Sequence, residues 1–578
     1  MAENDEVTVE KDVMVPMRDG IRLRADVFRP AVPGRHPVLV QRYPYSNRDG
    51  YMAIMGQMIA AQGYAVVVQS CRGRYGSEGD FYPFQPDVED SYDTVEWAAA
   101  QPWSNGKVGM YGASYSGLTQ WTAAIARPPH LVCITPFTCP WDWADSGWYY
   151  APGVMTLGLA LIWSAQMTAY EAERRGVTPP LPEVAEAASL LEGGGSDFME
   201  LIAKAFDLQT SAVRPLFERR PLRDIEELRD LAPWFRDWCD HDDQQDQYWR
   251  RTSAARHMEQ IELPILHLAG WYDYFARGGI EAFVTMHRYG VTEQTRRGQR
   301  LVIGPWNHNS AQVRPDADPN AGIFFDFSPG APVMRFFAHY LKGEFGGYDD
   351  EAPIRLYVMG ENTWRDEYEW PLSRTHWASY YLGSTHGHRS LGTDPPGQEG
   401  PDSFVYDPTD PVPGPVAIGF TFNDPVDLEA IAARPDVLVY TTSPLVEELE
   451  ITGPVTLELW ASSSVENTDF TAKLIDVFPD GRAIHLCQGI VRTGVGVARP
   501  RTPGAAYCYD IDLWATSVVL KKGHRIRLDV SSSEYPTYDL NPNTGRRITA
   551  DAGVVAATQT VFHDELHPSR LILPVIPR

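Results

Sequence analysis

A short joint between a strand-like run and a helical run restricts the fold of this chain more than any other feature. Val108–Tyr111 is apolar and strand-like, Leu118–Ala126 has helical spacing, and Ser114 lies at the apex of the turn between them. A serine on so sharp a turn is pushed out of the sheet, with its hydroxyl beside the free N–H groups of the helix. The joint therefore predicts an α/β sheet with a candidate nucleophile at its edge.

The residues around Ser114 depart by one position from the usual Gly-x-Ser-x-Gly pattern. Gly112 stands two residues before the serine, but Ser116 takes the place of the second glycine and Gly117 follows it. Small residues are needed there because strand and helix approach closely, and a serine is small enough to be tolerated. Taken alone, the pattern also fits an ordinary strand–turn–helix joint.

The first part of the chain has the pattern of a parallel sheet. Pro37–Gln41 and Tyr64–Gln69 are almost continuously apolar and rich in β-branched residues, and Met52–Gln62 between them has helical spacing. This is a βαβ arrangement, which predicts buried parallel strands. Two more buried strands, Leu263–Ala269 and Arg300–Gly304, come much later in the chain.

The regions between and after these strands differ in character. Long helical patterns rich in aromatic residues occupy Met155–Arg174, Leu181–Leu191 and Phe198–Leu208. Beyond about residue 352 helices are nearly absent, and alternating strands begin with Arg355–Met359. We therefore expect an α/β-hydrolase domain in residues 1–140 and 251–352, a helical cap insertion in 141–250, and a jelly-roll β-sandwich domain in 353–578.

Charge and composition exclude several classes of partner. The net charge is −26, from 50 basic and 76 acidic residues, which argues against nucleic acids and anionic membrane surfaces. No stretch approaches the roughly 20 apolar residues of a membrane span, and the acidic start of the chain is not a secretory signal. Six scattered cysteines without a C-x-x-C pair favour free thiols. We expect a cytoplasmic protein.

A serine nucleophile needs a base and an acid that orients the base, and both follow predicted strands. Asp273 comes directly after the strand that ends at Ala269, and His308 after the strand that ends at Gly304. The order serine, aspartate, histidine is that of α/β-hydrolases. A lone loop histidine is usually only a solvated polar residue, but three such residues in this order indicate a catalytic triad.

Two groups are candidates for the oxyanion hole. One is the backbone N–H of Tyr115, immediately after the nucleophile, and the other is the hydroxyl of Tyr45, which follows the strand Val38–Gln41. A tyrosine next to a proline in a loop is common, so spacing alone supports Tyr45 only weakly. The acid-rich runs Asp316–Gly322 and Asp240–Asp243 lack ordered ligand spacing, and no metal site is expected.

Together these motifs resemble the cocaine esterase family of acyl esterases, from about Val13 to the end of the chain. The resemblance rests on Gly112-x-Ser-Tyr-x-Gly117, Pro44-Tyr45, Gly270-Trp-Tyr-Asp273, Gly304-Pro-Trp-Asn-His308, Arg72-Gly-x-x-x-Ser-x-Gly79, Asp476-Val-Phe-Pro-Asp-Gly-Arg482 and Ser531-Ser-Ser-Glu-Tyr-Pro536. It implies a hydrolase domain split by a helical insertion and followed by a jelly roll. It also implies Ser114, Asp273 and His308 as the triad, the Tyr45 hydroxyl and Tyr115 amide as oxyanion donors, a homodimer, and no cofactor.

The resemblance also bears on the substrate. The branch that hydrolyses α-amino acid esters binds the substrate ammonium with acids two and three residues beyond the catalytic aspartate, where this chain has Phe275 and Ala276. In the aromatic-ester branch, tryptophans of the insertion and a phenylalanine after the aspartate enclose the acyl group, and Trp148, Trp163 and Phe275 match them. The alternative is that the two tryptophans are ordinary core of the insertion.

The sequence therefore predicts a serine carboxylesterase that acts on small-molecule esters with aromatic or bulky acyl groups through a covalent acyl-enzyme. An acylase or aminopeptidase-like amide hydrolase with the same triad stays open, because nothing in the motifs separates esters from amides. A non-catalytic binding protein of hydrolase fold is a remote alternative, since such proteins typically lose a triad member.

Overall fold

The computed structural model describes residues 7–46, 50–192, 198–308, 314–318, 321–322, 326–385, 388–414, 427–494 and 501–578. Its first domain is built on a ten-stranded sheet in the order β1-β2-β4-β3-β5-β6-β9-β10-β11-β12. The strands are β1 (Val7–Pro16), β2 (Arg22–Pro30), β3 (His36–Tyr43), β4 (Ala65–Ser70), β5 (Ser104–Ala113), β6 (Leu131–Phe137), β9 (Ile265–Gly270), β10 (Gln299–Gly304), β11 (Ile354–Val358) and β12 (Thr363–Glu367). Seven of them, β3, β4, β5, β6, β9, β10 and β11, run parallel. This is the α/β-hydrolase fold that the sequence predicts.

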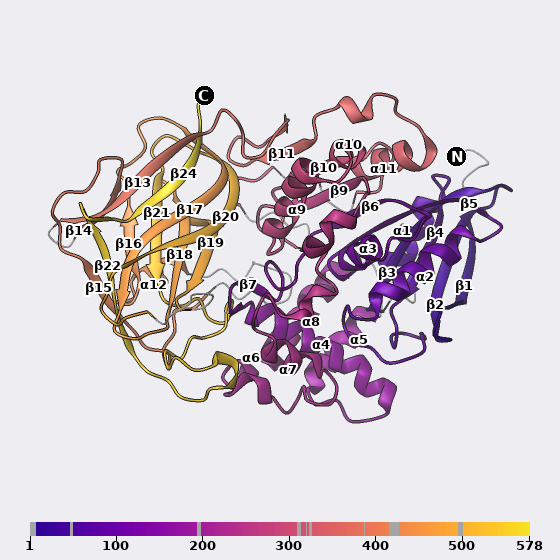
Figure 1. The fold of residues 1–578 in the computed structure, drawn as a ribbon, viewed down its shortest axis with the longest axis horizontal. Coiled ribbons are helices and arrows are strands. Elements are labelled where there is room, and N and C mark those ends of the chain that lie inside the picture. Colours follow the sequence, from indigo (N-terminus) through magenta and orange to yellow (C-terminus); the bar gives the residue numbers. More distant parts are fainter. Residues whose placement is uncertain are drawn as a thin grey trace.

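Helices cover both faces of this sheet, because both faces of its central strands are apolar. One core joins strand residues such as Val40 and Met110 to Leu118 of α3 (Tyr115–Ala126), and it includes residues of α2 (Asp87–Ala99) and α9 (Ala276–Tyr289). The other joins Leu39 and Tyr111 to α1 (Tyr51–Ala60) and α11 (Pro332–Phe337). Alternate residues of a strand thus enter opposite cores, and the sheet is the middle layer (Figure 1).

The insertion between β6 and β9 is largely helical and lies below the sheet in the view of Figure 1. Its helices are α4 (Leu157–Arg175), α5 (Pro182–Glu192), α6 (Phe198–Phe217), α7 (Trp234–Asp240) and α8 (Gln247–Arg250). The first three match the helical patterns in the sequence. The insertion also contains a short hairpin, β7 (Tyr149–Ala151) and β8 (Val154–Met155), that the sequence analysis did not predict.

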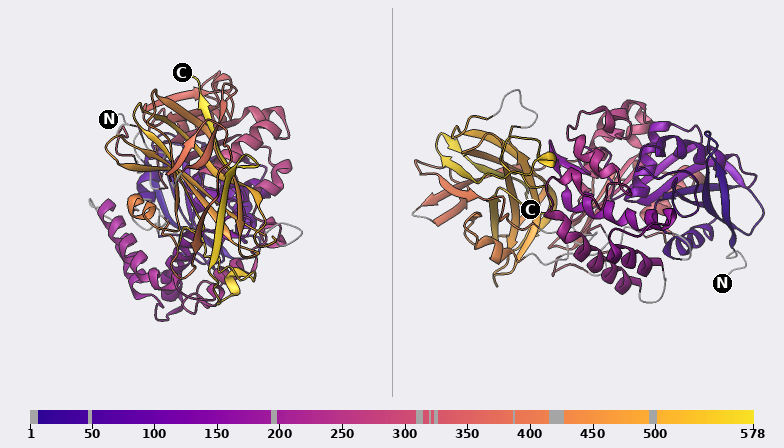
Figure 2. Two further views of the ribbon diagram at one scale, coloured as in Figure 1. Left: turned by 90° about the vertical axis from the view of Figure 1, so that its left-hand side faces the viewer. Right: turned by 90° about the horizontal axis from the view of Figure 1, so that it is seen from below.

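The C-terminal part is an all-β domain, as predicted, and packs beside the insertion (Figures 1 and 2). Its strands are β13 (His376–Thr385), β14 (His388–Gly392), β15 (Asp402–Tyr406), β16 (Leu438–Thr441), β17 (Leu449–Ser463), β18 (Asp469–Val477), β19 (Ala483–Arg492), β20 (Tyr507–Leu520), β21 (Arg525–Ser531), β22 (Ala557–Asp564), β23 (His567–Pro568) and β24 (Arg570–Ile576). Neighbours pair antiparallel except for β14 and β16. Jelly-roll topology stays a prediction.

The first sheet extends beyond the expected boundary of its domain. The run Arg355–Met359, expected to open the β-sandwich, contains β11, which pairs parallel to β10 in the first sheet with Leu301 opposite Ile354. Its hairpin partner β12 forms the edge of that sheet. The run alternates like a sandwich strand because it lies next to this edge. With β11 and β12 included, the first sheet extends to Glu367, beyond the expected boundary at residue 352.

Gly117 marks where α3 presses against the sheet. A Cβ atom at Gly117 would lie 2.5 Å from the Cβ of Cys139 and 3.2 Å from the Phe137 carbonyl oxygen. Gly279 in α9 is a helical glycine with room, because its Cβ would meet only the Ala269 Cβ, at 3.7 Å. Both glycines lie in helices, but only Gly279 has room for an added methyl group.

We predict that Gly117→Ala lowers the free energy of unfolding by about 1–3 kcal/mol, because the added methyl group overpacks the joint. Gly279→Ala should leave it unchanged or raise it by up to about 1 kcal/mol, since alanine is the better helix former. Urea denaturation followed by circular dichroism measures both. Equal effects at the two positions would contradict close packing at Gly117.

Candidate active site

Ser114 lies between β5 and α3, at the turn that the sequence predicts. Its backbone has φ 57° and ψ −120°, which residues other than glycine rarely adopt. The Ser114 N–H donates to the Phe137 carbonyl of β6 at 3.0 Å. The Ser114 carbonyl in turn accepts from the N–H groups of Gly117 and Leu118, at 2.9 and 3.0 Å. These three bonds fix a partly exposed serine at the carboxyl edge of the sheet.

The serine that replaces the second glycine of the usual pattern has a structural use. Ser116 is buried, and its Oγ donates to the Arg42 carbonyl of β3 at 2.9 Å. Gly112, with φ 128°, leaves room for it, because a Cβ there would lie 2.5 Å from the Ser116 Cβ. The departure from the pattern thus adds a bond between α3 and the sheet.

Asp273 and His308 are brought together by the loops after β9 and β10. The Asp273 Oδ2 lies 2.7 Å from the His308 Nδ1, and both side chains are buried. The other carboxylate oxygen of Asp273 accepts from the N–H of Phe275 at 2.7 Å. The bond from Nδ1 to the carboxylate sets the orientation and the tautomer of the His308 ring.

The two loops are held to each other by main-chain bonds. The Trp271 N–H donates to the Gly304 carbonyl at 2.9 Å, and the Tyr272 N–H to the Trp306 carbonyl at 3.0 Å. Gly270 permits this, because a Cβ there would lie only 2.2 Å from the Trp306 carbonyl oxygen. The position of Asp273 relative to His308 therefore depends on close backbone contact.

Tyr45 lies in the loop after β3 and is bonded to the insertion. The indole N–H of Trp163 in α4 donates to the Tyr45 hydroxyl oxygen at 2.8 Å. Arg74 secures the same loop, since its Nε donates to the Pro44 carbonyl at 2.8 Å. Burial raises the pKa of the Tyr45 hydroxyl above its usual value, although the bond from Trp163 and the charge of Arg74 act to lower it. The phenol therefore stays neutral and keeps its proton.

Tyr115 occupies the first position of α3. Its backbone N–H therefore has no acceptor within the helix and lies next to Ser114. Its side chain is anchored on the other side, where the hydroxyl donates to the Asp87 carboxylate at 2.6 Å and accepts from the Phe84 N–H at 3.1 Å. Burial raises the pKa of this hydroxyl, and the negative charge of Asp87 raises it further.

A buried ion pair supports this anchor from beneath. The Arg42 guanidinium, fully buried, lies 2.7 Å from the Asp87 carboxylate and also donates to Gln69 and Ser91, at 2.8 and 2.9 Å. Burial alone would lower the Arg42 pKa, but Asp87 and other nearby groups raise it overall, so the guanidinium stays charged. The main-chain carbonyl of Arg42 accepts from Ser116, and its guanidinium pairs with Asp87, which also accepts from the Tyr115 hydroxyl.

The three predicted substrate residues lie in one aromatic cluster. Phe275 packs edge-on against the His308 ring, with centroids 5.4 Å apart. Trp148 and Trp163 lie 5.4 Å from each other, and Trp163 stacks on the Tyr115 ring at 6.0 Å. The structure thus places rings of the insertion and of the β9 loop around the candidate site, next to His308 and Tyr115.

Sequence reasoning did not assign further rings of this cluster to the site, among them Phe84, Trp143 and Trp238. Phe84 stacks on Trp143 at 4.7 Å, and Trp238 stacks on Trp148 at 4.4 Å. Trp143 also contacts Phe275 at 5.5 Å. These residues come from the loop before α2, the segment after β6 and α7, so no spacing in the sequence connects them. The positive φ of Phe84, 70°, becomes visible only in the structure.

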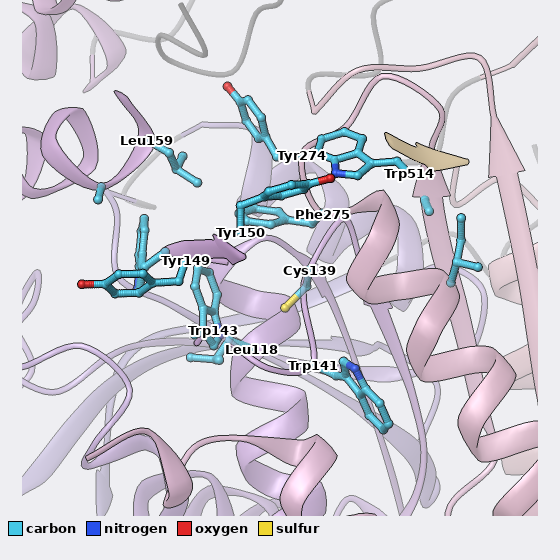
Figure 3. Close-up of a cluster of buried hydrophobic side chains, with 14 of the residues drawn as sticks. Leu118, Cys139, Trp141, Trp143, Tyr149, Tyr150, Leu159, Tyr274, Phe275 and Trp514 are labelled. Atoms are coloured by element: carbon cyan, nitrogen blue, oxygen red, sulfur yellow. The ribbon is translucent and has the colours of Figure 1, made fainter. Parts of the chain in front are cut away.

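A small hollow of about 20 Å³, room for about one water molecule, lies near the site, between the three regions of the chain. Its lining includes Tyr274, one residue after Asp273, and Trp514 of the β domain, which packs against Tyr150 with centroids 5.6 Å apart. Figure 3 shows Tyr150, Tyr274 and Phe275 gathered beside Trp514. The β domain therefore contributes to the surroundings of the candidate site.

Across the described ranges, no three His, Cys, Asp or Glu side chains gather as a metal site requires. In the same ranges, every helix is too short or too polar to cross a membrane. The Asp316 carboxylate, in the acid-rich run set aside above, pairs with Arg314 at 2.8 Å.

Known proteins resemble this chain along almost its whole length. Residues 19–310 match the family model of X-Pro dipeptidyl-peptidase (S15 family), and residues 346–572 match that of the X-Pro dipeptidyl-peptidase C-terminal non-catalytic domain. The chain is 38% identical over 599 residues to cocaine esterase of Rhodococcus sp. (strain MB1 Bresler), with 99% of each chain covered. The chain belongs to the cocaine esterase family. It is a serine hydrolase.

Two solved structures share the whole architecture of this cocaine esterase family member. An α-amino acid ester hydrolase is 26% identical with a TM-score of 0.75, covering 99% of this chain and 97% of its own. An aminopeptidase from a marine sediment archaeon, Thaumarchaeota archaeon, is 24% identical with a TM-score of 0.76, covering 100% and 98%. The second likeness concerns the fold alone.

We predict that Gly270→Ala lowers kcat/KM by about 10²-fold, because separating the β9 and β10 loops displaces Asp273 from His308. Gly392→Ala is the matched control: Gly392 also ends a strand, and a Cβ there meets nothing within 4 Å. Ester hydrolysis and circular dichroism, measured on both variants, separate loss of activity from loss of fold. Full activity in Gly270→Ala would contradict the dependence of the pair on this contact.

Proposed function

We propose that this protein is a serine carboxylesterase with Ser114 as nucleophile, His308 as general base and Asp273 as the residue that orients His308. The observation that carries the proposal is the buried 2.7 Å bond between Asp273 and His308, on loops that follow β9 and β10 at the same edge of the sheet as the strained Ser114 turn. The order of the three residues and their placement at the carboxyl ends of parallel strands support it.

In this mechanism His308 accepts the Ser114 proton through Nε2 while Oγ attacks the ester carbonyl carbon. Asp273 holds His308 in the required tautomer and stabilises the imidazolium that forms. The oxyanion accepts hydrogen bonds from the Tyr45 hydroxyl and the Tyr115 amide. Collapse of the intermediate expels the alcohol, which takes the proton from His308, and leaves an acyl-enzyme. Water then repeats the sequence and releases the carboxylic acid.

For the acyl group, we propose an aromatic or bulky substituent held by Trp148, Trp163 and Phe275. Their rings lie beside His308 and Tyr115, which supports contact with the part of the substrate next to the carbonyl carbon. The positions that carry acids in the α-amino acid ester branch hold Phe275 and Ala276, which argues against a bound ammonium group. The alternative, that Trp148 and Trp163 are only core, predicts no change in acyl preference when they are replaced by alanine, which removes the ring.

A second candidate function is hydrolysis of amides by the same residues. The match of residues 19–310 to a dipeptidyl-peptidase model favours it, because that activity cleaves a peptide bond. The chemistry differs mainly in the leaving group, which needs a proton from His308 as an amine departs. The homodimer and the cytoplasmic location stay predictions, which size-exclusion chromatography and cell fractionation would test.

We predict that Ser114→Ala abolishes hydrolysis, and that Tyr45→Phe lowers kcat by about 10²–10³-fold with KM little changed, since an oxyanion donor acts on the transition state. Steady-state kinetics with p-nitrophenyl acetate measure both. Activity that survives in Ser114→Ala would mean that the nucleophile is another residue. Wild-type turnover in Tyr45→Phe would remove Tyr45 from the mechanism and leave the triad in place.

We further predict that the p-nitrophenyl ester of benzoate is hydrolysed faster than those of acetate and butyrate, and all three faster than a matching p-nitroanilide. Aromatic contact with the acyl group raises kcat/KM for benzoate, and an anilide is the poorer leaving group. Initial rates, with Ser114→Ala as the background control, decide the order. Preferred cleavage of the anilide would instead support the amide hydrolase.

A further inference from the structure

The bond between Trp163 and Tyr45 joins two residues to which different roles have been assigned above. Trp163 is buried in α4, and its indole Nε1 lies 2.8 Å from the Tyr45 hydroxyl oxygen. A contact with the acyl group would use the face of the indole ring. The N–H group at its edge is instead directed at the oxyanion donor.

The chemistry of the two groups fixes the direction of this bond. An indole N–H only donates, whereas a phenol hydroxyl can donate one hydrogen and accept others. Tyr45 must therefore accept from Trp163, and its own hydrogen takes no part in the bond. Within the described part of the chain, this is the one hydrogen bond that the Tyr45 hydroxyl makes. The proton stays available for a substrate.

The same bond improves the hydroxyl as a donor. A hydroxyl that accepts a hydrogen bond is polarised and donates more strongly, so the two bonds reinforce each other. A group in the oxyanion hole gains most when it is aligned before the reaction, because no reorganisation is then needed.

Trp163 is itself held rigidly enough to align Tyr45. Its ring stacks on Tyr115 at 6.0 Å with an interplanar angle of 12°, and it contacts Trp148 and Trp234 at 5.4 and 6.1 Å. The Tyr45 ring packs edge-on against Tyr43 at 4.8 Å. Neither ring can rotate freely, so the distance between N–H and hydroxyl is set by packing.

We infer that Trp163 is a positioning residue for catalysis: its N–H holds the Tyr45 hydroxyl with the proton directed toward the oxyanion. This inference rests on the proposed role of Tyr45 and goes beyond it, because it assigns to the insertion a part in transition-state stabilisation in addition to shaping the pocket. A residue that acts in this way influences every substrate alike, whatever its acyl group.

The test is a double-mutant cycle of Trp163→Phe and Tyr45→Phe, with kcat and KM measured on p-nitrophenyl acetate, butyrate and benzoate. Trp163→Phe keeps an aromatic face for the acyl group and removes the N–H at the edge of the ring. It should therefore lower kcat by about tenfold, by a similar factor for all three esters, with KM little changed. In the Tyr45→Phe background the same substitution should change kcat less than about twofold, because the hydroxyl on which it acts is gone.

The matched control is Trp249→Phe. Trp249 is also buried in the insertion, but its indole N–H donates to the His241 carbonyl at 2.7 Å and its ring packs on Tyr149 and Tyr248. This variant removes an indole N–H and the same ring volume without touching the oxyanion hole, so kcat should stay within about twofold of wild type. Trp163 replaced by 3-benzothienylalanine, which has the size of tryptophan and no N–H, covers the case in which Trp163→Phe does not fold.

Three results would overturn the inference. They are equal losses for Trp163→Phe in the wild-type and Tyr45→Phe backgrounds, a loss confined to the benzoate ester, and full activity of the benzothienyl variant. If instead Tyr45→Phe alone retains wild-type turnover, the proposed role of Tyr45 fails, and the triad is unaffected. The two failures are therefore distinguishable in one set of measurements.

Discussion

The rest of the molecule depends on the strained backbone at Ser114. A residue other than glycine with φ 57° and ψ −120° costs roughly 1–3 kcal/mol. Three main-chain hydrogen bonds to β6 and to the first turn of α3 hold it there. The close approach of helix and strand that results requires Gly112 and Gly117, and it places the N-terminus of α3 at the carboxyl edge of the sheet. The loops after β9 and β10 end at the same edge, which is where Asp273 meets His308.

The sequence predicted the parts of this arrangement that follow from local pattern. The strands around Ser114 are buried on both faces and read as continuous apolar runs, and Asp273 and His308 follow two more runs of the same kind. Parallel strands share a carboxyl edge, so placing the three residues at one edge needed no knowledge of the rest of the fold.

Long-range packing could not be predicted in this way. The polar–apolar alternation of Ile354–Val358 fits an edge strand of either sheet, and only its pairing with β10 shows that it belongs to the first sheet. Phe84 and Trp238 meet across distant segments that no periodicity connects.

Contacts between the three regions hold the surroundings of the site together. Arg492 of the β domain is fully buried between Asp469 and Asp539, at 2.8 and 3.0 Å, and Asp539 accepts from the Met155 N–H of the insertion at 3.0 Å. Arg277 in α9 donates to the Tyr150 carbonyl at 2.6 Å. Removing one partner of such a buried ion pair would leave an uncompensated charge. Because Asp539 of this pair also accepts from Met155, the ion pair links the β domain to the insertion. The hollow beside Tyr274 and Trp514 owes its shape to this link.

The dense packing of tryptophans in the insertion has an optical consequence. Trp148 lies 4.4 Å from Trp238, 4.8 Å from Trp143 and 5.4 Å from Trp163. Indole transitions at such separations couple, and fixed ring geometry gives them a circular dichroism signal in the near ultraviolet that is lost when side-chain packing loosens. Because Trp163 stacks on Tyr115 and donates to Tyr45, this signal reports on the packing around Tyr115 and Tyr45 in the unlabelled protein. Near-ultraviolet circular dichroism can therefore follow side-chain packing where the insertion meets the first sheet.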